Sequence, residues 1–65
     1  MIKEFTRADV PGNEKILILT EYILTVQDVF ENGQRKCTEI RLKTRIVHLV
    51  HETIAQVKAM IPNPP

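Results

Sequence analysis

Residues 36–61 read KCTEIRLKTRIVHLVHETIAQVKAMI and carry the most regular apolar pattern in the chain. Aliphatic residues recur at a heptad spacing, with two more on intervening positions: Ile40, Val47, Ile54 and Ile61, then Val50 and Val57. On a helix these side chains form one narrow seam, which is typical of helices that pack against other helices. The pattern therefore predicts a helix over 36–61, ended by the prolines that follow, with the seam as its self-association surface.

The preceding segment, residues 14–31, is expected to form a second helix. Its apolar residues alternate between spacings of three and four: Ile16, Leu19, Ile23, Val26 and Phe30. The segment is also rich in Ile, Val, Thr and Tyr, which are enriched in strands. We give the periodicity more weight than the composition and predict a helix. Asn32–Gly33 then ends it, because glycine readily adopts the left-handed conformation that follows many helices.

A competing interpretation makes Asn32–Gly33 a tight hairpin turn between two strands, the second of them at 34–42. Residues Thr38, Ile40 and Leu42 alternate as that strand requires. The preferred fold class is all-α: an antiparallel helical hairpin of 14–31 and 36–61, with coiled-coil packing, that pairs with a copy to form a four-helix bundle. The alternative is an α+β strand–strand–helix dimer.

The chain is expected to form a single small domain over residues 1–65. Residues 1–13, which include the turn sequence Val10-Pro11-Gly12-Asn13, are interpreted as an irregular arm, and residues 62–65 as a frayed proline tail. A chain of 65 residues buries little apolar area, and its lone Cys37 has no partner for an internal disulfide. We therefore expect the chain to be stabilised by forming a homo-oligomer, either a dimer or a larger assembly.

The composition indicates a folded, soluble protein. Apolar residues make up 43% of the chain and charged residues 26%, which argues against disorder. No apolar run reaches bilayer-spanning length, and a single thiol suits a reducing compartment, so we expect a cytoplasmic protein without a membrane partner.

The formal net charge of +1 conceals an asymmetry between the two halves of the chain. Residues 1–33 carry three basic and six acidic side chains, a net charge of −3, whereas residues 34–65 carry six basic and two acidic ones, a net charge of +4. This distribution favours antiparallel pairing of the two halves and leaves a basic surface for an acidic partner.

The string His48-Leu49-Val50-His51-Glu52 is the closest match to a metal site. On a helix, two of its polar side chains converge on one ion. The order does not match the zinc-protease motifs, however, and no third ligand lies nearby in the sequence. We interpret these residues as a polar flank with His48 paired to Glu52 across one helical turn, and predict no metal and no cofactor.

Five cations lie within eleven residues: Arg35, Lys36, Arg41, Lys43 and Arg45. Such a cluster neutralises phosphates in nucleic-acid-binding proteins. No aromatic residue is interleaved for base stacking, and the chain as a whole is nearly neutral. A small nucleic-acid-binding regulator is therefore the alternative function.

The preferred function is a self-associating protein-interaction module that regulates, inhibits or bridges a partner protein by occupying its surface. Leu17 and Leu24 lie off the main stripe of the first predicted helix, and Phe5 lies on the irregular arm, so these three are the predicted partner contacts. Enzymatic activity is not expected, because Cys37 lacks a neighbouring base and no phosphate loop or carboxylate pair is present.

Overall fold

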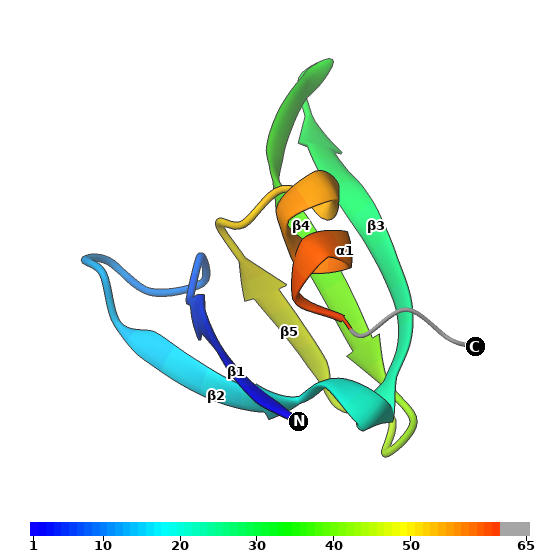
Figure 1. Ribbon diagram of the computed structural model, residues 1–65. Helices are drawn as coiled ribbons and strands as arrows, with labels where there is room; N and C mark the ends of the chain where they lie inside the picture. The colour runs from blue at the N-terminus through cyan, green and yellow to red at the C-terminus, as the bar shows by residue number, and fades with distance from the viewer. Residues whose placement is uncertain (62–65) are drawn as a thin grey trace.

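Strands dominate the structure, a computed structural model that describes residues 1–61 (Figure 1). The elements in chain order are β1 (Ile2–Thr6), β2 (Lys15–Leu19), the short 3₁₀ helix η1 (Thr20–Tyr22), β3 (Ile23–Glu31), β4 (Gln34–Leu42), β5 (Val47–Val50) and α1 (Ile54–Met60). Strands β1 and β2 form one antiparallel hairpin, and β3, β4 and β5 form an antiparallel sheet in that order. The long β3–β4 hairpin extends beyond the rest of the molecule (Figure 1).

The two sheets meet where β1 ends beside β5. Arg7 forms an isolated bridge with Val50, the Ala8 amide donates to the Leu49 carbonyl at 2.8 Å, and the His51 amide donates to the Thr6 carbonyl at 2.9 Å. The strands therefore follow one another in space as β2, β1, β5, β4 and β3, although β1 and β5 are joined only at residues 6–8 and 49–51.

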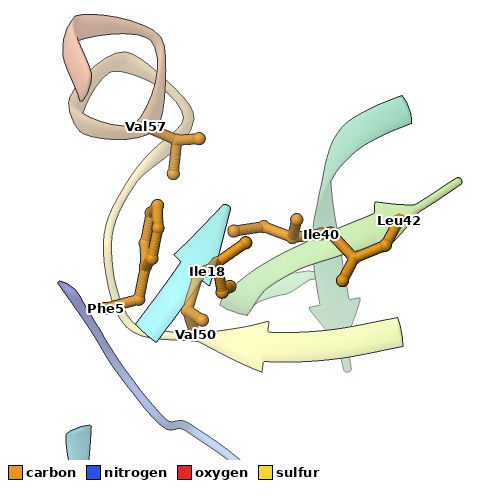
Figure 2. Packing of buried hydrophobic residues seen from close by; sticks show 6 residues of the cluster. All are labelled: Phe5, Ile18, Ile40, Leu42, Val50 and Val57. Atoms are coloured by element: carbon orange, nitrogen blue, oxygen red, sulfur yellow. The ribbon is translucent and has the colours of Figure 1, made fainter. Parts of the chain in front are cut away.

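The hydrophobic core lies between the two sheets and α1. It consists of Phe5, Ile18, Ile40, Leu42, Val50 and Val57, drawn from β1, β2, β4, β5 and α1 (Figure 2). Val57 points from the helix toward Phe5, so the single helix closes the core. The apolar residues of the chain thus converge from distant positions in the sequence rather than along one helical seam.

Residues 14–31 form β2, η1 and β3, so the predicted first helix is wrong. In β2 the side chains of Ile16 and Ile18 turn inward, whereas those of Lys15, Leu17 and Leu19 are exposed. This two-residue alternation lets a strand bury one face, and the β-branched composition of the segment favours the same conformation. The spacing of three and four that predicted a helix joins residues that lie on opposite faces or in different strands.

Asn32 and Gly33 form the tight turn of the β3–β4 hairpin, with φ angles of 53° and 78°. Both residues adopt the left-handed conformation that a two-residue hairpin turn requires. The turn and the bounds of β4 agree with the competing interpretation of the sequence. That interpretation did not include β1 or β5, and its helix was longer than α1.

The predicted helix over 36–61 is also wrong, since only Ile54–Met60 are helical. Ile40 and Val47 lie on different strands, and the register places Val47 opposite Arg41, whose side chain lies on the other face from that of Ile40, so Ile40 is buried whereas Val47 is exposed. Of the predicted seam, only Ile54, Val57 and the C-cap residue Ile61 belong to α1. The helical hairpin, the coiled-coil seam and the four-helix bundle are therefore excluded as descriptions of this chain.

The N-terminal segment is more ordered than the predicted irregular arm, because Ile2–Thr6 form strand β1. The predicted proline tail, 62–65, lies outside the described residues. Within residues 1–61, no helix has the length and apolar character needed to cross a membrane.

Candidate functional site

The outer face of the β1–β2 hairpin carries three large apolar side chains. The strand register places Ile2 opposite Leu19, and Glu4 opposite Leu17. Directly opposed residues share a face, and this face points away from the core residues Phe5 and Ile18. Ile2, Leu17 and Leu19 are 59%, 66% and 38% exposed, so they form a contiguous apolar surface, which we call the hairpin face.

The hairpin face borders an unpaired strand edge. The Thr20 amide donates to the Met1 carbonyl and the Arg7 amide to the Glu14 carbonyl, both at 2.8 Å. In an antiparallel pair, hydrogen-bonded and non-hydrogen-bonded positions alternate. Residues 16 and 18 of β2 therefore bond to β1, whereas the backbone groups of residues 15, 17 and 19 point to the open edge.

The opposite edge of β1 confirms this alternation. Thr6 pairs with Lys15 at a non-hydrogen-bonded position, and its backbone groups point away from β2. The Thr6 amide donates to the Glu52 carboxylate at 2.9 and 3.1 Å, and its carbonyl accepts from the His51 amide. The outward groups of Thr6 therefore have partners, whereas within residues 1–61 those of Ile2 and Glu4 on β1 and of Lys15, Leu17 and Leu19 on β2 have none.

The predicted partner contacts do not gather on one surface. Phe5 is fully buried in the core and presents no surface to a partner, so its assignment as an anchor is corrected. Leu17 lies on the hairpin face. Leu24 is exposed, but it lies at the register shift near the start of β3, in the other sheet. Of the three predicted contacts, only Leu17 lies on the hairpin face.

The predicted basic segment is divided by ion pairs. Arg35 donates to Asp28 Oδ1 at 2.8 Å, to the Thr38 hydroxyl, and to the Glu52 carbonyl at 3.4 Å. Lys36 pairs with Glu31 at 3.1 Å, and Arg41 with Glu39 at 3.5 Å. Three of the five cations are therefore matched by acidic residues from the same sheet.

The remaining two cations, Lys43 and Arg45, lie in the turn between β4 and β5, where Arg45 has a φ of 71°. The Lys43 amide donates to the Tyr22 carbonyl at 2.7 Å, which brings η1 beside this turn. Tyr22 is 49% exposed. The fold thus places an aromatic residue next to the basic turn, although the sequence separates them by some twenty residues.

The predicted metal candidates do not form a site. His48 lies in β5, whereas His51 lies in the bend that follows the strand, and the Glu52 carboxylate is bound by Thr6. Among the described residues, no group of three potential ligands is close enough to hold a metal ion. The predicted pairing of His48 with Glu52 across a helical turn is wrong, because α1 begins after both residues.

The loop after β1 contains an ion-pair cluster centred on Arg7. Its side chain donates to both carboxylate oxygens of Asp9, at 3.1 and 3.2 Å, and to Glu14 Oε1 at 2.7 Å. The hydrogen bonds from Arg7 hold the pKa of Asp9 below its usual value, and the same contacts raise the pKa of Arg7. This cluster fixes the loop and lacks an activated nucleophile. Cys37 is a free, buried thiol that lies outside the main core cluster.

Two residues of the hairpin face, Ile2 and Leu19, were not among the predicted contacts. The alternation of residues 15–19 is the signal that identifies Leu19, since it assigns Leu19 to the same face as Leu17. Ile2 joins this face only through its cross-strand pairing with Leu19. No protein-family model matches this chain, and no curated protein or solved structure shows significant similarity to it.

Proposed function

We propose that this protein is a protein-interaction module that regulates, inhibits or bridges another protein by contact through the hairpin face. The proposal is carried by one observation: Ile2, Leu17 and Leu19 lie side by side on the outer side of a hairpin whose inner side already supplies the core. Single exposed apolar residues are ordinary, but contiguous ones mark interaction surfaces. The proposed function involves no chemical reaction.

The proposal places the protein in the cytoplasm. Its support is the lone thiol of Cys37, which is buried and has no second cysteine to pair with. Such a residue is compatible with a reducing compartment, where thiols stay reduced.

The variant Leu17→Lys tests the role of the hairpin face. The new cation lies opposite Glu4, so the hairpin keeps a favourable cross-strand pair while its apolar surface is interrupted. Leu24→Lys is the matched control, because it changes an equally exposed leucine on the other sheet. We expect proteins captured by the wild type and by Leu24→Lys to be lost with Leu17→Lys, measured by quantitative mass spectrometry of captured proteins. An identical set for all three baits contradicts the proposal.

Nucleic-acid binding is the second candidate, and the position of Tyr22 beside Lys43 and Arg45 favours it. An exposed aromatic residue whose backbone contacts a turn with two cations supplies the groups that bind single strands through stacking and phosphate contacts. This candidate predicts that oligonucleotide binding weakens steeply with added salt and is lost in the Lys43→Gln, Arg45→Gln double variant. Fluorescence anisotropy with single-stranded DNA and RNA measures both effects. An absence of binding at low salt eliminates this candidate.

A further inference from the structure

We propose that Asn32 is a modification site, at which the side-chain amide is converted to a carboxylate through a cyclic imide formed with Gly33. The reaction consumes only water and proceeds without an enzyme. It takes place at the tip of the β3–β4 hairpin, which extends beyond the rest of the molecule (Figure 1). The inference does not involve the hairpin face and goes beyond the proposed function.

The reaction is a ring closure followed by a ring opening. The backbone nitrogen of Gly33 loses its proton to hydroxide and forms a bond to Cγ of Asn32, while the bond from Cγ to Nδ2 breaks and Nδ2 takes up a proton and leaves as ammonia. Water then adds to one of the two carbonyl carbons of the ring. Opening at Cγ gives aspartate, whereas opening at the backbone carbonyl gives isoaspartate, whose main chain runs through the side-chain carbons. Either product replaces a neutral amide by a carboxylate, so the formal net charge falls from +1 to zero.

The turn leaves the reacting groups accessible. Asn32 and Gly33 are both exposed, and apart from its chain neighbours no described residue comes within 4 Å of the position that a Cβ atom of Gly33 would take. The ladder of the hairpin ends at the pair of Glu31 with Gln34, and in the described part of the chain the Gly33 amide donates no hydrogen bond. The reacting nitrogen is therefore neither shielded by a side chain nor held by an acceptor, and water reaches the imide.

The charges around the tip favour the anions through which the reaction passes. Asn32 lines an open hollow of about 320 Å³ together with Glu31, Gln34, Arg35 and Lys36. This lining carries two cations and one carboxylate, and Lys36 binds Glu31 at 3.1 Å while both remain more than half exposed. A neighbouring excess of positive charge favours the deprotonated Gly33 nitrogen and the oxyanion that forms at Cγ. The hollow therefore assists the ring closure.

The two routes of ring opening have different consequences for the hairpin. Aspartate keeps the backbone of the turn, in which Asn32 and Gly33 have φ angles of 53° and 78°. Isoaspartate adds one main-chain carbon to a turn of two residues, and the geometry of such a turn fixes the register of the strands that it joins. The longer turn therefore displaces the closing pair of Glu31 with Gln34.

The other two asparagines of the chain are internal controls. Asn13 is also exposed, but it precedes Glu14, whose side chain hinders the ring closure and whose charge disfavours a second negative charge. Asn63 precedes Pro64, whose nitrogen has no proton to lose. We therefore expect the modification at Asn32 alone.

Peptide mapping by mass spectrometry, after incubation of the full chain at neutral and at mildly alkaline pH, tests the site. We expect the peptide that contains Asn32 to gain the mass of an amide-to-acid exchange, to incorporate oxygen from heavy-oxygen water, and to separate into two forms, one of which matches Asn32→Asp. The rate is expected to rise by about tenfold per pH unit, because the reacting nitrogen must first lose a proton. If Asn32 stays unchanged in the folded chain while it reacts in the urea-unfolded chain, the fold protects this residue and the inference is overturned.

A pair of lysine variants tests whether the hollow assists the reaction. Lys36→Gln removes a cation that lines the hollow, and we expect it to slow the reaction at Asn32 by about two- to fivefold, the size of an exposed charge interaction. Lys43→Gln, in the turn between β4 and β5, is the matched control and is expected to leave the rate unchanged. Circular dichroism of both variants confirms that the fold is retained. Equal rates in the wild type and in Lys36→Gln contradict the role of the hollow.

Discussion

The two phenylalanines of this chain show how position decides the role of a residue. Phe5 is part of the core, lies below Val57 of α1 in Figure 2, and is completely buried. Phe30 lies near the end of the β3–β4 hairpin and is 64% exposed. The same side chain therefore supports the fold at one position and only covers the surface of a hairpin at the other.

We predict that Phe5→Ala destabilises the protein by about 3–5 kcal/mol, because it removes a large buried ring and leaves a cavity. Phe30→Ala is the matched control and is expected to change stability by less than about 0.5 kcal/mol, as exposed substitutions do. Urea denaturation followed by circular dichroism measures both values. Equal effects of the two substitutions are incompatible with the core described above.

At the Arg7 cluster, we predict that the pKa of the Asp9 carboxyl lies below its usual value and returns toward that value in Arg7→Gln. The hydrogen bonds from Arg7 favour the charged carboxylate, and desolvation opposes this effect more weakly. A lowered folded pKa means that the stabilisation is present above the unfolded pKa and is lost as pH falls through the folded pKa. An NMR titration of Asp9 measures the shift, with Lys58→Gln on α1 as the control. An unshifted Asp9 in the wild type contradicts the ion pair.

The single helix shows how a short element is defined by its caps. The Thr53 hydroxyl accepts from the Gln56 amide at 3.1 Å, and the Gln56 side chain accepts from the Thr53 amide at 2.8 Å. This reciprocal capping box satisfies two amides at the start of α1. Its sequence signature, Thr-Ile-Ala-Gln, marks the true helix start at Ile54, eighteen residues after the predicted start at residue 36. The capping residues, rather than the heptad spacing, locate this helix.

We predict that Thr53→Ala lowers the free energy of unfolding by about 1 kcal/mol, because the Gln56 amide loses its acceptor. Thr44→Ala, in the exposed turn before β5, is expected to have an effect below about 0.5 kcal/mol. Thermal unfolding and exchange of the α1 amides measure the difference. A loss of the same size at both positions indicates that the cap does not stabilise the helix.

At the scale of the whole molecule, the structure depends on the junction between its two sheets. Glu52 lies just before α1, and its carboxylate accepts from both the amide and the hydroxyl of Thr6 at the end of β1. Arg35, from β4, donates to the Glu52 carbonyl. These contacts connect the β1–β2 hairpin, the β3–β4–β5 sheet and the start of the helix across a large separation in sequence.

We predict that Glu52→Ala destabilises the protein by about 1–3 kcal/mol, because it leaves the nearly buried Thr6 amide without an acceptor. The exposed Glu4 provides the control, and Glu4→Ala is expected to change stability by less than about 0.5 kcal/mol. Urea denaturation gives both values, and amide exchange at Ala8 reports whether β1 separates from β5. An unchanged stability in Glu52→Ala shows that the junction does not depend on this carboxylate.

The sequence by itself determined the local features of this protein. The turn at Asn32–Gly33 follows from the left-handed preference of those two residues, and the helix end near Ile61 follows from the change from helix formers to proline. Inward and outward side chains of a strand alternate in the sequence of 15–19 and of 38–42. The same residues also belong to the three-and-four and heptad spacings of apolar residues that are typical of a helix. Local pattern alone therefore did not choose between helix and strand for 14–50.

Only the tertiary structure decided that choice and the position of the candidate site. A strand is stabilised by cross-strand neighbours such as Ile2 opposite Leu19, which no local spacing contains. The pairing of β1 with β2 leaves Ile2, Leu17 and Leu19 together beside an open edge, and the packing of the two sheets and α1 buries Phe5. Ion pairs within the β3–β4 hairpin divide the basic segment. The pairing of Ile2 with Leu19 and the core packing of Phe5 join residues distant in sequence, so their energy enters only when the sheets assemble.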